Sequence, residues 1–129
     1  MNRYLLQEQN GYKFIERIDL SNSNKFFVKR GFSISDKSET IPNTIYLDGA
    51  FKGPLFDIKN NIFSLDHHEN CIRQITKSTC EQALLFTKYG DFYSIYNVIG
   101  NDPDLDTILA GWILLNIDEI KKSEVYKKL

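Results

Sequence analysis

The sequence predicts an α/β fold in which a small parallel, or mixed, sheet is flanked by helices. Three short apolar runs, 44–49, 61–69 and 92–100, have the length and the β-branched and aromatic content of buried strands. Helix patterns follow the second and third runs, and this alternation is typical of a parallel sheet covered on both faces. The 129 residues, 42% of them apolar, suit one compact domain.

The first 43 residues are expected to form a β-rich extension (1–43) ahead of the α/β domain (44–129). Runs 12–18 and 25–32 are rich in aromatic and β-branched residues and are joined by the turn-rich DLSNSN, which predicts a hairpin. Run 33–43 has the composition of a linker. The lysines among the aromatic residues of 25–32 have two interpretations, the protection of an edge strand or the binding of single-stranded nucleic acid.

The predicted helices are bounded by recognisable ends. Ser78 with Glu81 three residues later is a capping box, and Gly90 is a typical C-terminal stop, so we expect a helix between them. Run 102–123 is predicted to form one long helix. Run 50–60 is expected to be a loop or a small excursion between strands.

Composition argues against several classes of protein. A net charge of −1 with interspersed acids and bases lacks the basic footprint of a duplex-binding protein. No apolar run reaches the roughly 18 residues of a membrane span, and the N-terminal stretch lacks the apolar core of a signal peptide. Cys71 and Cys80 are too few for a disulfide scaffold. We therefore expect a cytoplasmic protein with reduced thiols and no membrane association.

Acids and histidines follow all three predicted strands. They are Asp48 after the first strand, Asp66, His67 and His68 after the second, and Asp102, Asp104 and Asp106 after the third. Because the carboxyl ends of parallel strands lie at one edge of a sheet, where α/β proteins bind ligands, we expect these side chains to meet.

These residues also have interpretations that require no function. Helix capping explains one aspartate at a helix start, although three within five residues exceed that need. A polar surface turn explains His67 and His68, the only histidines. Oxygen donors with one or two nitrogens favour Mn²⁺ or Mg²⁺. Two such ions activate water and bind phosphoryl oxygens, and a histidine outside the metal shell can donate a proton to the leaving oxygen.

The motifs resemble those of the DHH phosphoesterase superfamily, which includes single-strand exonucleases, manganese-dependent pyrophosphatases, exopolyphosphatases and cyclic-dinucleotide phosphodiesterases. Asp66-His67-His68 is the triplet that gives the family its name, and a strand ending in aspartate, here Asp48 in IYLDG, lies 18 residues before it. IYNVIGNDPDLDT is similar to the family's NPDxDS motif. It follows the triplet here instead of coming first, which implies a circular permutation. The resemblance covers about residues 44–116.

The resemblance implies a compact, permuted hydrolase that uses two Mn²⁺ or Mg²⁺ ions to cleave a phosphoester or phosphoanhydride. Four side chains would be metal ligands: Asp48, which bridges the ions, His67, Asp104 and Asp106. His68 would contact phosphate or act as the acid, and Asp66 would orient its neighbours. The substrate would be a phosphate-containing small molecule, such as a nucleotide or polyphosphate, or a single-stranded nucleic acid.

The chain departs from the family pattern at three points. Asn101 and Asp102 occupy the region where the family motif often has a metal-binding histidine. The family's fourth aspartate has only Asp57 and Asp91 as candidates, and the family's separate substrate-binding domain has no counterpart. The departures motivate an alternative, a catalytically incomplete domain that binds a nucleotide, a metal or a protein. A third interpretation is an unrelated α/β interaction domain. An exposed sheet edge also suggests a homodimer.

Overall fold

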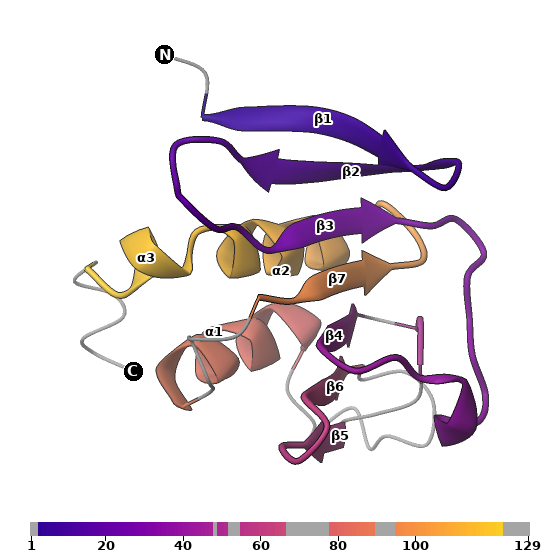
Figure 1. Ribbon diagram of the computed structural model, residues 1–129. Helices are drawn as coiled ribbons and strands as arrows, with labels where there is room; N and C mark the ends of the chain where they lie inside the picture. The colour runs from indigo at the N-terminus through magenta and orange to yellow at the C-terminus, as the bar shows by residue number, and fades with distance from the viewer. Residues whose placement is uncertain (1–2, 48, 52–54, 67–77, 90–94, 123–129) are drawn as a thin grey trace.

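A computed structural model describes residues 3–47, 49–51, 55–66, 78–89 and 95–122, which build one mixed sheet with helices (Figure 1). The strands are β1 (Tyr4–Gln9), β2 (Tyr12–Arg17), β3 (Lys25–Val28), β4 (Thr44–Leu47), β5 (Leu55–Asp57), β6 (Ile62–Leu65) and β7 (Asn97–Gly100). Their order in the sheet is β1-β2-β3-β7-β4-β6-β5. The helices are α1 (Thr79–Tyr89), α2 (Leu105–Leu115) and α3 (Ile117–Ile120), with a 3₁₀ turn, η1, at Lys37–Glu39.

The centre of the sheet is parallel, and this confirms the expected α/β architecture. β3 pairs with β7, β7 with β4, and β4 with β6, all in parallel. The outer pairs β1–β2, β2–β3 and β5–β6 are antiparallel, so the sheet as a whole is mixed. Every residue of β4 and β6 is buried, which explains why these strands appear in the sequence as continuous apolar runs.

Three strands from the N-terminal part of the chain, β1, β2 and β3, continue this sheet. The predicted hairpin is confirmed by the antiparallel pairing of β2 and β3, and β3 then joins the parallel centre through β7. β3 is an interior strand, so the interpretation of run 25–32 as a guarded edge strand is wrong. The edges formed by the described strands are β1 and β5. β5 lies in run 50–60 and returns to β6 through Asn61, whose positive φ of 53° is one that asparagine tolerates in turns.

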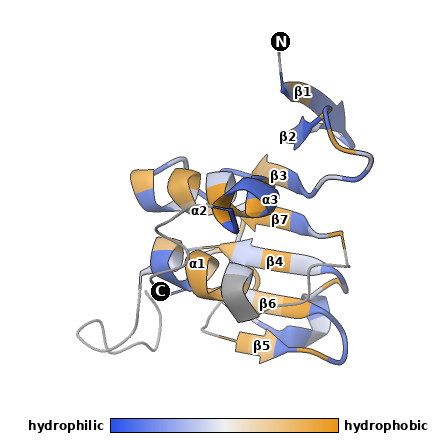
Figure 2. Cartoon of the chain, turned by 90° about the vertical axis from the view of Figure 1, so that its left-hand side faces the viewer, coloured by the Kyte–Doolittle hydropathy of each residue, from blue (hydrophilic) through white to orange (hydrophobic). Residues whose placement is uncertain are grey.

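The described helices cover one face of the sheet, which corrects the expectation of helices on both faces (Figure 2). Side chains of α1 and α2 pack on alternate strand residues such as Ile45, Phe63 and Val98. The opposite face buries Tyr46, Ile99 and their neighbours under chain that contains Phe32, Ile34 and Phe51. The connection from β3 to β4 contains the short 3₁₀ turn η1, and its side chains Phe32 and Ile34 pack on that face.

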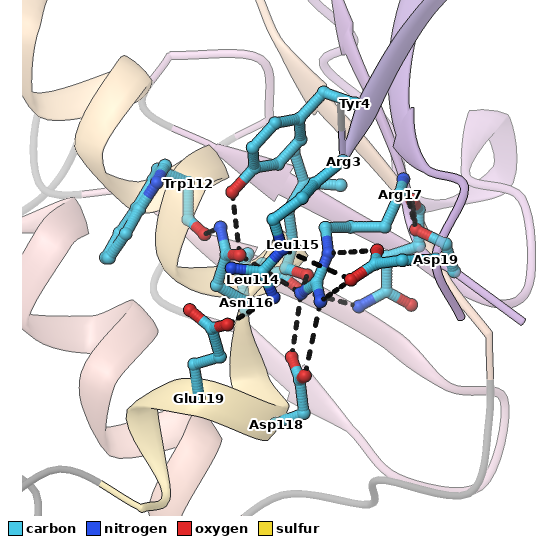
Figure 3. A network of polar contacts seen from close by, with 12 residues as sticks. Arg3, Tyr4, Arg17, Asp19, Trp112, Leu114, Leu115, Asn116, Asp118 and Glu119 are labelled. Atoms are coloured by element: carbon cyan, nitrogen blue, oxygen red, sulfur yellow. Dashed lines mark hydrogen bonds and ion pairs between the residues drawn. The ribbon is translucent and has the colours of Figure 1, made fainter. Parts of the chain in front are cut away.

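The predicted helix over 102–123 is interrupted at Asn116, so α2 and α3 are separate helices. Asn116 is fully buried and its backbone is not helical, with φ −118° and ψ 32°. Its Oδ1 accepts hydrogen bonds from Tyr4 Oη (2.8 Å) and Arg17 Nη1 (3.1 Å), as Figure 3 shows. The interruption therefore anchors the N-terminal strands to the helical layer.

Arg17 is the centre of this network. Its side chain is 1% exposed. Its guanidinium donates to both carboxylate oxygens of Asp19 at 2.8 Å, to Asp118 Oδ1 at 2.9 Å and to the Leu115 carbonyl at 3.4 Å. Arg17 and, to a lesser extent, Arg3 hold the pKa of Asp19 well below its usual range. Charge-assisted bonds of this kind satisfy a buried cation that would otherwise be costly.

Candidate functional site

The carboxyl ends of β4, β6 and β7 meet at one edge of the sheet, as the sequence predicts. Asp66, which follows β6 and is fully buried, accepts a hydrogen bond at Oδ1 from the Gly49 amide at 3.0 Å. A Cβ on Gly49, which has a φ of 86°, would lie 2.9 Å from Asn101 Nδ2. Residues that follow three separate strands are therefore in direct contact.

The N-termini of α1 and α2 are tied together by Asp106. Its Oδ1 accepts from the Cys80 amide at 2.8 Å and its Oδ2 from the Thr79 amide at 3.1 Å, so a carboxylate of α2 caps α1. Asp104 caps its own helix, because its Oδ1 accepts from the Thr107 amide at 2.8 Å. Both aspartates thus have the capping role that requires no further function. Each carboxylate lies at the N-terminus of a helix, where the positive end of the helix dipole stabilises its negative charge.

The predicted cap of α1 is also present. Ser78 Oγ accepts from the Glu81 amide at 3.2 Å and donates to Glu81 Oε1 at 3.2 Å. The serine hydroxyl is therefore both a donor and an acceptor, and these two bonds hold the first turn of α1 at the carboxyl edge. Gly90, the predicted end of this helix, lies outside the described residues.

Two buried hydroxyl groups accompany Asp106. Thr79 and Thr107 are fully buried, and their Oγ1 atoms have no hydrogen-bond partner among the described residues. Gly100 allows α2 to approach β7 here, because a Cβ on it would lie 2.4 Å from Thr107 Cγ2. Carboxylate and hydroxyl oxygens, the polar side-chain atoms found here, are donors that suit Mg²⁺ or Mn²⁺ better than a metal that prefers sulfur.

A thiolate ligand does not fit this set. Burial raises the pKa of the Cys80 thiol, and the charges of Asp106 and Glu81 raise it further. The thiol is therefore protonated at neutral pH, and a protonated thiol is a poor metal ligand.

Several predicted site residues lie outside the described residues: Asp48, His67, His68 and Asp91. Within the described ranges no group of three or more His, Cys, Asp and Glu side chains is placed to hold a metal. What the structure provides is the border of the predicted site, namely Gly49, Asp66, Asn101 and the two helix N-termini. Asp102 is exposed beside them.

Asp57 does not belong to this edge, so the expectation that it adds a ligand is wrong. It pairs with Ile62 at the beginning of β6, whereas Asp66 follows the end of that strand. Asp57 accepts from the backbone and side chain of Asn60 and forms an ion pair with Lys37 at 2.9 Å. These contacts, with Asn60 first, lower the pKa of Asp57 to about 2. Its role is to hold the β5–β6 turn.

Two further residues lie near this edge, and neither belongs to the metal site that the sequence predicts. Gln82 is buried and donates from Nε2 to the Asp66 carbonyl at 3.2 Å. Lys29 follows β3, and its amide donates to the Gly100 carbonyl at 2.8 Å. Its ammonium lies 4.3 Å from the Tyr12 ring centroid and 5.5 Å from that of Phe32, and burial lowers its pKa. The mixed aromatic and basic composition of run 25–32 was the available hint.

Comparisons of the chain with protein-family models, curated proteins and solved structures give no match. Among the helices of the described ranges, none combines the length and the apolar character needed to cross a bilayer. The class that the residues themselves define is an α/β protein with a cluster of polar groups at the carboxyl edge of its parallel strands.

Proposed function

We propose that the protein is a metal-dependent phosphohydrolase of the DHH type, which cleaves a phosphoester or phosphoanhydride at the carboxyl edge of β4, β6 and β7. The observation that carries the proposal is the hydrogen bond from Gly49 to Asp66. Gly49 adjoins Asp48 in the chain and Asp66 adjoins His67. Two motifs that are 18 residues apart in the sequence therefore leave the sheet from contacting points, as a shared site requires.

The proposed ligands are Asp48, His67, Asp104 and Asp106, with Asn101 as a further oxygen donor. When bound, two divalent ions supply an activated water and neutralise charge on the phosphoryl oxygens. Support for such ions comes from the position of Asp104 and Asp106 at the start of α2, which follows β7 at the edge where Gly49 contacts Asp66. In this proposal the cation also offsets the repulsion among the acids around α2.

The remaining residues have positioning and proton-transfer roles. Asp66 is held by the Gly49 amide and by Gln82, so the segment that begins at His67 starts from a fixed point. His68 is the proposed proton donor to the leaving oxygen. The Lys29 amide binds the Gly100 carbonyl at the end of β7, and the positive charge of its side chain is proposed to attract a substrate that carries phosphate over a distance. The substrate class is a nucleotide, an oligonucleotide or a polyphosphate.

Metal titration with matched variants tests this proposal. Calorimetry with Mn²⁺ is expected to give micromolar or tighter binding to the wild type and none to Asp48→Asn or His67→Ala. Asp57→Asn is the control, because it removes the same charge at the opposite edge and leaves Mn²⁺ binding unchanged. Phosphate or nucleotide release from a substrate panel should follow the same order. Failure of the folded wild type to bind Mn²⁺ would end the proposal.

One observation favours the second candidate, a catalytically incomplete domain that binds a nucleotide, metal or protein. The carboxylates of Asp104 and Asp106 already accept backbone amides at the starts of α1 and α2. A domain that retained these aspartates for capping alone would keep the fold without turnover. Ligand binding that persists in His68→Ala, with no hydrolysis by the wild type, distinguishes this candidate from the hydrolase.

A further inference from the structure

α2 is apolar on the side that faces away from the sheet. Its inner face buries Ala110, Ile113 and Leu114 against the strands. Its outer face carries large apolar side chains at positions i, i+3, i+4 and i+7, with these exposures: Leu105 74%, Ile108 40%, Leu109 41% and Trp112 46%. A helix that is apolar all round is typically buried on both sides. The outer face therefore indicates a contact that one copy of the chain does not make within the described residues.

A groove runs beside this outer face. It has a volume of about 340 Å³ and lies between α2 and the β1–β2 hairpin, lined by Tyr4, Ile15, Phe26, Ile108, Trp112 and Leu115. Its floor continues to Leu6, which pairs with Ile15 and is 61% exposed. In Figure 2 the described helices lie over the inner strands and leave β1 and β2 uncovered on that side. An apolar sheet face and an apolar helix face thus adjoin each other.

We propose that a second copy of this chain covers this surface, so that two copies associate about a two-fold axis with α2 of each lying on the β1–β2 floor of the other. Among the described residues, each copy leaves one helix face and one sheet face uncovered, and an apolar helix face is a surface that packs well on an apolar sheet face. Packing of a helix on a sheet is also how α2 buries its inner face within one copy. A two-fold axis lets both contacts form at once.

The area is sufficient for such a dimer. The exposed parts of Leu6, Ile15 and the four outer residues of α2 amount to roughly 600 Å² per copy, at the upper limit of apolar patches on monomers. A standard interface buries about 800 Å² per partner, so this patch supplies most of what is needed. Pairing between the β1 edges of two copies would leave the outer face of α2 uncovered, and the area therefore favours the helix-on-sheet arrangement.

Sedimentation and fluorescence test the dimer on the wild-type chain. We expect a mass of twice the 15.0 kDa of one chain at high protein concentration. Trp112 is the only tryptophan, and its half-exposed indole becomes buried on association. Its emission should therefore shift to the red on dilution, at the same concentration at which the mass falls. A monomer from micromolar to submillimolar concentration overturns the proposal, and this result needs no substituted protein.

Two variants locate the interface. Leu105→Glu on α2 and Leu6→Glu on the hairpin floor each bury one glutamate of each copy in the interface. We expect the dissociation constant of the dimer to rise at least about a hundredfold. Ile58→Glu is the matched control, since Ile58 is 77% exposed outside the patch and should leave the dimer intact. Far-ultraviolet circular dichroism checks that all three keep the fold. A dimer that persists in both patch variants uses another face and contradicts the proposal.

Discussion

Replacement of Arg17 by methionine removes the cation that joins β2 to the junction of α2 and α3, while it retains the length of the side chain. The buried acceptors that lose a donor are the Asn116 side chain and the Leu115 carbonyl. Each buried acceptor left unsatisfied costs about 1–3 kcal/mol. Asn116 keeps its bond from Tyr4, and the partially exposed carboxylates of Asp19 and Asp118 regain water, so the cost lies toward the lower end.

The expected loss is about 2–3 kcal/mol in the free energy of unfolding, which for a domain of this size lowers the melting temperature by about 10 °C. Urea unfolding and thermal melts followed by circular dichroism measure both quantities. Arg30→Met is the control, because Arg30 is exposed and its loss should cost little. Arg17→Lys should recover only part of the loss, since an ammonium cannot donate the fork of two bonds to Asp19. Equal stability of Arg17→Met and Arg30→Met would refute the reasoning.

Three further predictions concern packing, capping and acid stability. Gly111→Ala would place a Cβ 2.3 Å from the Phe26 ring, so it should lower the free energy of unfolding in urea by about 1–3 kcal/mol. In a chain that already carries Phe26→Ala, the loss caused by Gly111→Ala should be much smaller. Additive losses in the double variant would contradict the contact. Asp106→Asn should cost about 1–2 kcal/mol because it weakens the cap of α1, whereas Asp102→Asn, at an exposed position, should cost less than half of that; equal losses would argue against the cap. The folded-state pKa of Asp57 is about 2, below the 3.8 of an unperturbed aspartate, so the stabilisation by its carboxylate is present above pH 3.8 and is lost as the pH falls toward 2. The free energy of unfolding, measured over this pH range, should therefore decline less in Asp57→Asn than in the wild type. Parallel curves for the two proteins would contradict the assignment.

The parallel centre and the polar residues at its carboxyl edge could be predicted because local sequence determines them. β4 and β6 are short apolar runs, and alternation with helices makes their parallel pairing the expected arrangement. β5 could not be predicted with the same ease, since its three residues carry little pattern. The assignment of β3 to the interior depends on β7, which lies about 70 residues later in the chain.

The break between α2 and α3 and the role of Asp106 depend on contacts between distant residues. Asn116 leaves the helix to meet Tyr4 and Arg17, and no local propensity signals these partners. Local rules predict that Asp106 stabilises its own helix, whereas it caps α1, which begins 27 residues earlier. Sequence patterns therefore indicated that Asp66, Asp104 and Asp106 follow strands of the parallel centre but not which amides these residues bind.

The most direct test of the central claim is a crystal structure grown with Mn²⁺ and measured at a wavelength that gives manganese an anomalous signal. We expect anomalous peaks within coordination distance of Asp48, His67 and Asp104, beside the contact between Gly49 and Asp66. Crystals saturated with Mn²⁺ that show no peak at this edge, with those side chains directed away from one another, would contradict it.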